Sequence, residues 1–180
     1  MIFQKNTLTS ASILLLLSPV VTLTARAEVY MTGEEAAKVF FPGQSFKKHI
    51  KELSNDEKNK IEKLSDTKIK SRIINLLVSV EGNVVYLDQV IGKHEQISFA
   101  VGITKEAKVK GIEILEYRES YGHQVRREEW RKQFVGKDKS STLKNNQDIK
   151  NISGATLSSN HITEGVRRIL QTYEVIKKSL

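Results

Sequence analysis

The sequence predicts an α+β fold, in which helices cover a mostly antiparallel sheet. Two hairpin patterns in the middle of the chain carry this prediction, since alternating apolar residues flank Glu81–Asn83 and Lys105–Lys108. A long stripe of apolar residues at helical spacing follows near the C-terminus, from Ile162 onward. An antiparallel sheet of this kind buries one face and needs helices against it, so we expect one domain that contains both.

Residues 1–27 have the pattern of a secretory signal peptide. Lys5 supplies the positive charge at the start, an apolar run from Ala11 to Leu23 follows, and Ala25-Arg26-Ala27 matches the small-x-small cleavage pattern. The sequence therefore predicts an exported protein of the periplasm or cell envelope. A bilayer span needs about 20 apolar residues, so the run is short for a membrane anchor, but an uncleaved anchor is the alternative.

The composition narrows the kinds of site that the chain can hold. It has no cysteine, which excludes disulfides, thiolate metal sites, a lipobox anchor and a c-type haem. The four histidines do not fall at metal-ligand spacing, so we expect no metal site. The formal net charge is +8, and removal of residues 1–27 leaves +6. For an exported protein this charge favours anionic ligands, acidic partners or an anionic membrane surface over nucleic acid, although a solubilising surface explains it equally well.

Two helix starts mark the segment that precedes the sheet. Thr32–Glu35 and Ser54–Glu57 both have capping-box spacing, and Pro42-Gly43 ends the first helix. The charge-rich run Lys47–Arg72 predicts an outer, partly solvated helix. We therefore assign residues 28–72 to an N-terminal helical segment and residues 73–180 to the domain that follows it.

The domain begins with four predicted strands, over residues 73–80, 84–91, 96–104 and 109–117. Strict alternation in the last of them places Ile112, Ile114 and Glu116 on one face and Glu113, Leu115 and Tyr117 on the other. A short helix over 126–134, ended by Gly136, and a polar loop over 137–146 come next. The last helix is predicted from Ser158 to about Lys178, and its apolar stripe consists of Ile162, Val166, Ile169, Leu170, Tyr173 and Ile176.

The most informative stretch is Ser153-Gly154-Ala155-Thr156, in which three small residues lead into a hydroxyl just before the last helix. Gly154 and Ala155 let other groups approach the backbone closely. The first N–H groups of a helix have no partner within it and carry partial positive charge, which suits a phosphate. The stretch therefore predicts a tight turn that presents Thr156 to an anion. An ordinary capped turn, with Ser158 or Ser159 as the N-cap, is the alternative.

Three motifs together resemble the FMN-binding domain family. Ser-Gly-Ala-Thr-Leu-Ser-Ser, at 153–159, is similar to the attachment motif of that family, which includes the C subunit of the sodium-pumping NADH:quinone oxidoreductase, the G subunit of Rnf electron-transport complexes and small exported proteins. Glu119-Ser120-Tyr121-Gly122, directly after a strand, is similar to the acid, hydroxyl and glycine that line the flavin pocket in the family. Trp130, Gln133, Phe134 and Gly136 match its Trp-x-x-Gln-Phe-x-Gly pattern. The resemblance extends over residues 92–170, and more weakly over 30–43.

The resemblance implies that FMN is the cofactor, linked through its phosphate to Thr156. The residues that it assigns to cofactor binding are Ser153, Gly154, Ala155, Thr156, Leu157, Ser158, Glu119, Ser120, Gly122 and Trp130. It implies an exported electron carrier in preference to a stand-alone enzyme. The electron donor and acceptor of this carrier would be membrane or periplasmic redox proteins linked to quinone or haem. No catalytic residue is assigned. The alternatives are a noncovalent FMN binder, a flavin-dependent reductase with its own substrate, and an exported ligand-binding or scaffold module without flavin.

One position departs from the family pattern. The family usually has an aspartate three residues before the serine of the motif, within the recognition signal of the FAD:protein FMN transferase. That position is Lys150 here, and the nearest acid is Asp148. Enzymatic attachment by the transferase and tight noncovalent binding of FMN therefore both stay open.

Overall fold

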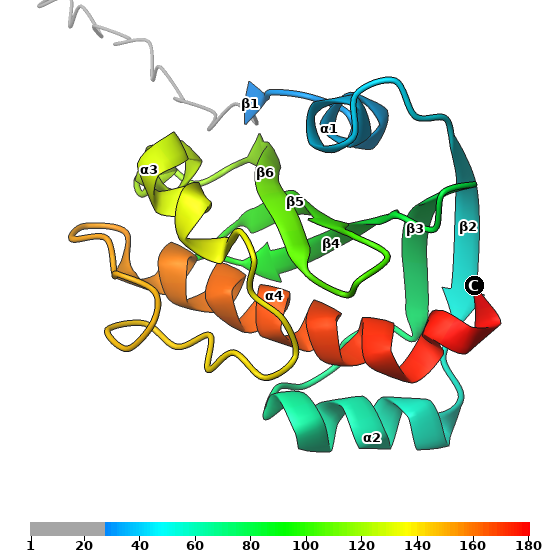
Figure 1. The fold of residues 1–180 in the computed structure, drawn as a ribbon. Helices are drawn as coiled ribbons and strands as arrows, with labels where there is room; N and C mark the ends of the chain where they lie inside the picture. Colours follow the sequence, from blue (N-terminus) through cyan, green and yellow to red (C-terminus); the bar gives the residue numbers. More distant parts are fainter. Residues whose placement is uncertain (1–27) are drawn as a thin grey trace, which may run out of the picture.

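The computed structural model describes residues 28–180, which form one six-stranded antiparallel sheet and the helices around it (Figure 1). The predicted signal peptide lies outside the described residues. The strands follow the order β1-β6-β5-β4-β3-β2 and consist of β1 Glu28–Val29, β2 Phe46–Glu52, β3 Ile73–Ser79, β4 Val84–Ile91, β5 Gln96–Ile103 and β6 Val109–Tyr117. The helices are α1 Gly33–Phe40, α2 Asn55–Ser65, α3 Glu128–Arg131 and α4 Thr156–Ile176, with the 3₁₀ turns η1 His123–Arg126, η2 Lys132–Phe134 and η3 Lys177–Ser179. The predicted α+β class is confirmed.

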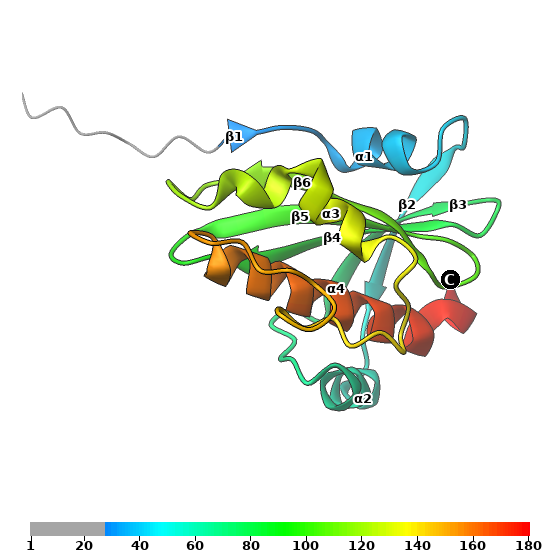
Figure 2. The ribbon, with the colours of Figure 1, turned by 60° about the vertical axis from the view of Figure 1, so that its left-hand side comes forward.

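Helices cover both faces of the sheet, where the sequence had indicated one buried face. The long helix α4 crosses one face and α1 lies on the other (Figure 2). Along β5, Phe99 and Val101 belong to the core on the α4 side, whereas Ala100 belongs to the core on the α1 side. A Cβ at Gly102 would lie 2.7 Å from the ring of Phe40, so this glycine lets α1 pack directly on the strand.

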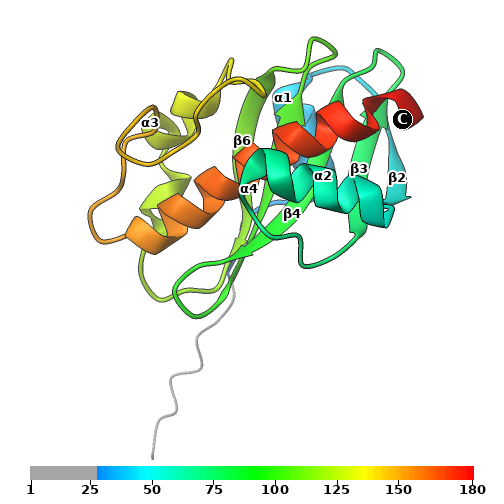
Figure 3. The same ribbon diagram turned by 90° about the horizontal axis from the view of Figure 1, so that it is seen from below.

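The helical prediction for the N-terminal segment is right for α1 and α2 and wrong between them. Both capping boxes form, at Thr32 and at Ser54. The charged stretch Phe46–Glu52, however, is a strand that pairs antiparallel with β3. This strand forms one edge of the sheet. Its lysines oppose pairing of the exposed edge with strands of other chains. The sheet thus includes residues from both predicted segments, and α2 packs beside α4 (Figure 3).

A β-bulge in β6 changes which face Tyr117 occupies. Ser98 pairs with Glu116 but Phe99 pairs with Ile114, so Leu115 is the extra residue. The extra residue reverses the alternation, because a bulged strand places two residues opposite one. Leu115 lies on the face opposite Ile112 and Ile114, as predicted, and packs there on the α1 side. Tyr117, however, lies with Ile112 and Ile114 in the core on the α4 side. The predicted facing of Tyr117 is therefore wrong, and its hydroxyl reaches the start of α4.

The last helix begins at Thr156, two residues before its predicted start. Its N-cap residue, Ala155, provides no side-chain cap, and Ser158 and Ser159 lie inside the helix with buried side chains. The alternative in which one of these serines caps the turn is therefore not what the structure shows. The predicted apolar stripe is buried along the whole helix. Within residues 28–180, no helix is both long enough and apolar enough to cross a membrane.

Candidate functional site

Thr156 occupies an exposed position at the N-terminal end of α4. Its Oγ1 accepts a hydrogen bond of 3.2 Å from the side-chain amide of Asn151. Gly154 adopts a left-handed conformation with φ of 80°, and nothing lies within 4 Å of the place where a Cβ would be. Ser153 is exposed too, and so is Leu157, at 45% of its surface. The turn therefore presents a hydroxyl, an open stretch of backbone and the uncapped amides of the first helical turn to the outside.

A network of polar side chains holds Asn151 behind this turn. The buried hydroxyl of Ser159 donates to Asn151 Oδ1 at 2.6 Å and accepts from Asn145 Nδ2 at 3.1 Å. Thr163, one turn further along α4, donates its hydroxyl to the carbonyl of Ser159 at 2.7 Å, and the same oxygen lies 3.2 Å from Asn145 Oδ1. Since each member is held by another, the amide that contacts Thr156 is fixed in place. The sequence analysis missed both asparagines. Asn145 lies in the predicted polar loop, and Asn151 lies two residues before the Ser153 motif without being one of its residues.

The bend at residues 119–122 packs against the start of α4. The hydroxyl of Tyr117 donates to the carbonyl of Tyr121 at 2.6 Å and lies 3.0 Å from Ser158 Oγ. Gly122 has a φ of 93°, and a Cβ there would lie 2.5 Å from the Tyr117 hydroxyl and 3.2 Å from Ser158 Oγ. The absence of a side chain at Gly122 is therefore required by packing inside the protein. Ser158, predicted to bind the cofactor, is buried and joins the bend to α4.

Glu119 ties the same bend to the turn between β4 and β5. Its Oε1 accepts the backbone N–H groups of His94 and of Glu95, the latter at 2.9 Å. Burial raises the pKa of this carboxyl, but the backbone hydrogen bonds lower it by more, so the pKa of Glu119 lies below its usual value. Ser120 and Tyr121 are exposed beside it. The structure thus brings the bend next to the Thr156 turn, with the carboxylate of Glu119 engaged by backbone.

We expect the contribution of Glu119 to stability to disappear in acid. A carboxyl with a lowered pKa in the folded state stabilises the fold above the pKa of the unfolded chain, and this stabilisation is lost as the pH falls through the folded-state pKa. The difference in free energy of unfolding between wild type and Glu119→Gln should therefore shrink between pH 7 and pH 3 in denaturant titrations. Glu95→Gln, at an exposed acid of the same turn, is the control. A difference that stays constant with pH would contradict the expectation.

Trp130 and Gln133 clamp the main chain of Lys150. The indole N–H of Trp130 donates to the carbonyl of Lys150 at 2.9 Å, and Gln133 Oε1 accepts the Lys150 N–H at 2.7 Å. Trp130 is only 5% exposed and meets Phe134 edge to face, with 5.0 Å between ring centroids. The predicted helix over 126–134 consists of α3 and η2, and η1 precedes it. The Trp-x-x-Gln spacing therefore positions the chain three residues before Ser153, while a contact of Trp130 with a cofactor ring stays a prediction.

Asp148, the acid nearest to that position, is fully engaged in its own loop. Its carboxylate accepts the backbone N–H groups of Leu143 and Lys144, both at 3.0 Å, and the ammonium of Lys137 at 3.2 Å. Burial raises the pKa of Asp148, and these donors lower it by more, so the pKa lies below its usual value. Lys150 itself is exposed. Asp148 thus stabilises the loop and does not stand in for the aspartate that position 150 lacks.

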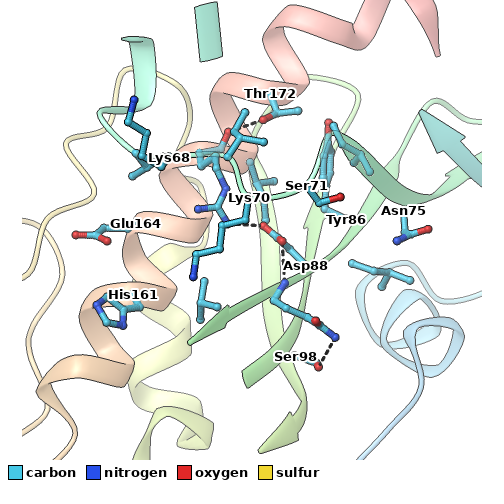
Figure 4. A pocket seen from close by; sticks show the side chains of 18 of the residues that line it. Lys68, Lys70, Ser71, Asn75, Tyr86, Asp88, Ser98, His161, Glu164 and Thr172 are labelled. Carbon is cyan, nitrogen blue, oxygen red and sulfur yellow. Dashed lines mark hydrogen bonds and ion pairs between the residues drawn. The ribbon is translucent and has the colours of Figure 1, made fainter. Parts of the chain in front are cut away.

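A cavity of about 1030 Å³ lies on another side of α4, between this helix, β4 and the loop after α2 (Figure 4). His161, Glu164, Arg168 and Thr172 line it from the helix. A ring nitrogen of His161 contacts the carbonyl of Ile91, and Arg168 forms an ion pair with Asp88 at 2.8 Å. No motif in the sequence pointed to this cavity. In residues 28–180, histidines and carboxylates do not gather in any group of three or more that could hold a metal ion.

Comparison with known families identifies the region that holds the motifs. Residues 92–171 match the family model of the FMN-binding domain. The matched range begins at the turn that Glu119 binds and includes the bend, the Lys150 clamp and the Thr156 turn. A comparison with curated proteins finds none that matches the chain.

Proposed function

From the FMN-binding domain that residues 92–171 form, with FMN as its cofactor, we propose that this protein is an exported electron carrier whose FMN is esterified through its phosphate to Thr156. The observation that carries the proposal is the position of Thr156, the first residue of α4, with its hydroxyl at the surface. The domain match favours this function over a binding or scaffold module without flavin.

The groups around Thr156 fit the phosphate end of FMN. The first-turn amides of α4 have no side-chain cap, and the backbone at Gly154 is open to approach. A phosphate that is esterified at both ends keeps one negative charge. The positive end of a helix dipole stabilises such a charge by about 0.3–1 kcal/mol. The donor set and the open backbone thus suit an anion held at this turn.

Exposed residues on both sides of the turn are candidates for contact with the ring of FMN. Leu157 offers an exposed apolar side chain directly after Thr156, and Ser120 is exposed in the neighbouring bend. When bound, FMN supplies the transfer of one or two electrons, and the protein supplies position and electrostatics. The contributions of the chain are then to hold the Thr156 oxygen with Asn151 and to fix the bend through Glu119 and Tyr117.

Tight noncovalent binding is the second candidate, because of Lys150. The transferase that attaches FMN in this family would meet a cation where the family pattern has a carboxylate, and Asp148 is engaged elsewhere. The clamp from Trp130 and Gln133 acts on the backbone of residue 150, so the local chain path does not depend on which side chain is present. The attachment turn could therefore be built correctly and still be a poor substrate for the transferase.

The proposed export and redox roles can be tested together on the full-length protein. We expect expression in a bacterium that has the FMN transferase to give a yellow protein in the periplasmic or envelope fraction, cleaved after Ala27. Dithionite should bleach its flavin absorbance and air should restore it, as required of a carrier between quinone- or haem-linked redox proteins. Exported protein without flavin, or flavin that cannot be reduced and reoxidised, would contradict the proposal.

A further inference from the structure

The neighbours of Asn151 determine which way its side-chain amide faces. Its Oδ1 lies 2.6 Å from the hydroxyl of Ser159 and 3.3 Å from Nδ2 of Asn145. A separation of 2.6 Å is normal for an O–H···O hydrogen bond and short for an N–H···O bond, so the atom that faces Ser159 is the oxygen. The nitrogen of the same amide therefore faces the hydroxyl of Thr156.

This orientation makes the oxygen of Thr156 the acceptor of the hydrogen bond from Asn151. The bond is 3.2 Å long, and an amide nitrogen can only donate. The hydroxyl proton of Thr156 is thus not used in this contact, and it can leave toward the outside because Thr156 is exposed. When the proton leaves, the oxygen keeps an N–H donor beside it.

The amide of Asn151 is held from inside the protein. Ser159 is 0% exposed, and its hydroxyl also accepts from Asn145 Nδ2 at 3.1 Å. Ser159 reaches Asn151 from α4 and Asn145 reaches it from the preceding loop, so rotation of the amide would break two contacts. A donor fixed in this way needs no reorganisation when charge develops on the atom it faces.

We propose that Asn151 is a positioning residue for the attachment of FMN to Thr156, and that Ser159 acts through Asn151. This inference rests on the proposed attachment. In that reaction the Thr156 oxygen forms a bond to the flavin-side phosphorus of FAD, and the anhydride bond to the AMP half breaks. AMP leaves with the electron pair of the broken bond, and the hydroxyl proton passes to a base of the transferase. The N–H of Asn151 stabilises the negative charge that develops on the oxygen, because hydrogen bonds to charged atoms are about twice as strong as neutral ones.

The kinetics of attachment measure this role. The flavin-free mature protein is incubated with FAD and purified FAD:protein FMN transferase, and the gain of one FMN is followed by intact mass. We expect Asn151→Ala to lower kcat by about 10- to 100-fold, as the loss of one hydrogen bond to a charge predicts. The KM for the protein should stay within about twofold, since the contact strengthens only in the transition state. Asn160→Ala is the matched control, because this half-buried asparagine of α4 bonds Glu164, and it should keep the wild-type kcat.

A double-mutant cycle tests whether Ser159 acts through Asn151. Ser159→Ala should lower kcat by a smaller factor than Asn151→Ala, because the amide remains but is held less firmly. The double variant should be no slower than Asn151→Ala alone. Two independent effects on the fold would instead add, since only residues that share a contact are coupled. An additive double variant would therefore overturn the role given to Ser159.

The outcomes separate this inference from the attachment itself. Every variant is made in wild type and in Lys150→Asp, which restores the family pattern. An unchanged kcat in Asn151→Ala, an effect confined to KM, or an equal fall in Asn160→Ala would overturn the role of Asn151 and leave attachment at Thr156 intact. Absence of flavin from every variant in both backgrounds would overturn both. Denaturant titration shows which flavin-free variants are folded at the assay temperature, and Asn151→Ser, with a shorter polar side chain, carries the same expectation if Asn151→Ala is not.

Discussion

Thr156→Ala will carry no flavin through denaturation, whereas wild type purified from its exported compartment will keep one FMN per chain. The substitution removes one exposed hydroxyl, whose single side-chain hydrogen bond comes from Asn151. Because that bond is at the surface, we expect the free energy of unfolding to change by no more than about 1 kcal/mol. A loss of flavin would then report on the ester bond and not on the fold. Intact mass and flavin absorbance after denaturation in guanidinium measure the retained cofactor.

The neighbouring hydroxyls provide the controls for this experiment. Ser153→Ala removes another exposed hydroxyl of the same turn and should keep the flavin, and Thr156→Ser should keep it at least in part. Flavin retained by denatured Thr156→Ala would refute the assignment of the attachment residue. If native wild type is yellow but denatured wild type releases all its flavin, the noncovalent candidate is correct. In that case Lys150→Asp, which restores the family pattern, is the variant in which covalent flavin should appear.

The parts of the fold that could be predicted are those decided by neighbours in sequence. The capping boxes at Thr32 and Ser54 and the two hairpins are local patterns, and the structure confirms them. Strand β2 is different, because Phe46–Glu52 is charged enough to suggest a solvated helix and becomes a strand only by pairing with β3. The bulge at Leu115 depends on the register between β5 and β6, which no alternation within β6 reveals.

The same distinction separates the predicted from the unpredicted parts of the site. The Thr156 turn is a contiguous motif, so its place at the start of the last helix followed from the sequence. Asn151 could not be found in this way, because its role depends on Ser159 and Asn145, which reach it from α4 and from the preceding loop. The cavity that Tyr86 lines could not be predicted from a sequence pattern either. A tyrosine in a buried strand suggests core packing, and only the structure shows that its hydroxyl has no partner.

Gly122→Ala will be the most destabilising of the single-methyl changes near the site. A left-handed backbone costs an alanine about 1–2 kcal/mol, and the new Cβ would lie 2.5 Å from the Tyr117 hydroxyl. Tyr117 cannot swing aside, since it is 2% exposed and its hydroxyl bonds the Tyr121 carbonyl and Ser158. Overpacking in a fixed environment adds about 1–3 kcal/mol. We therefore expect the free energy of unfolding to fall by about 3 kcal/mol, and denaturant titration checks it.

The substitution Gly154→Ala separates the backbone cost from the packing cost in the stability loss expected for Gly122→Ala. Gly154 has nearly the same backbone conformation as Gly122, with φ of 80° against 93°, but nothing lies within 4 Å of its would-be Cβ. Its substitution should cost only the conformational term, about 1 kcal/mol. Equal losses at the two glycines would mean that the contact of Gly122 with Tyr117 and Ser158 contributes nothing. A larger loss at Gly122, together with weaker flavin incorporation, would instead show that the bend at 119–122 must rest on the first turn of α4 for the attachment turn to keep its shape.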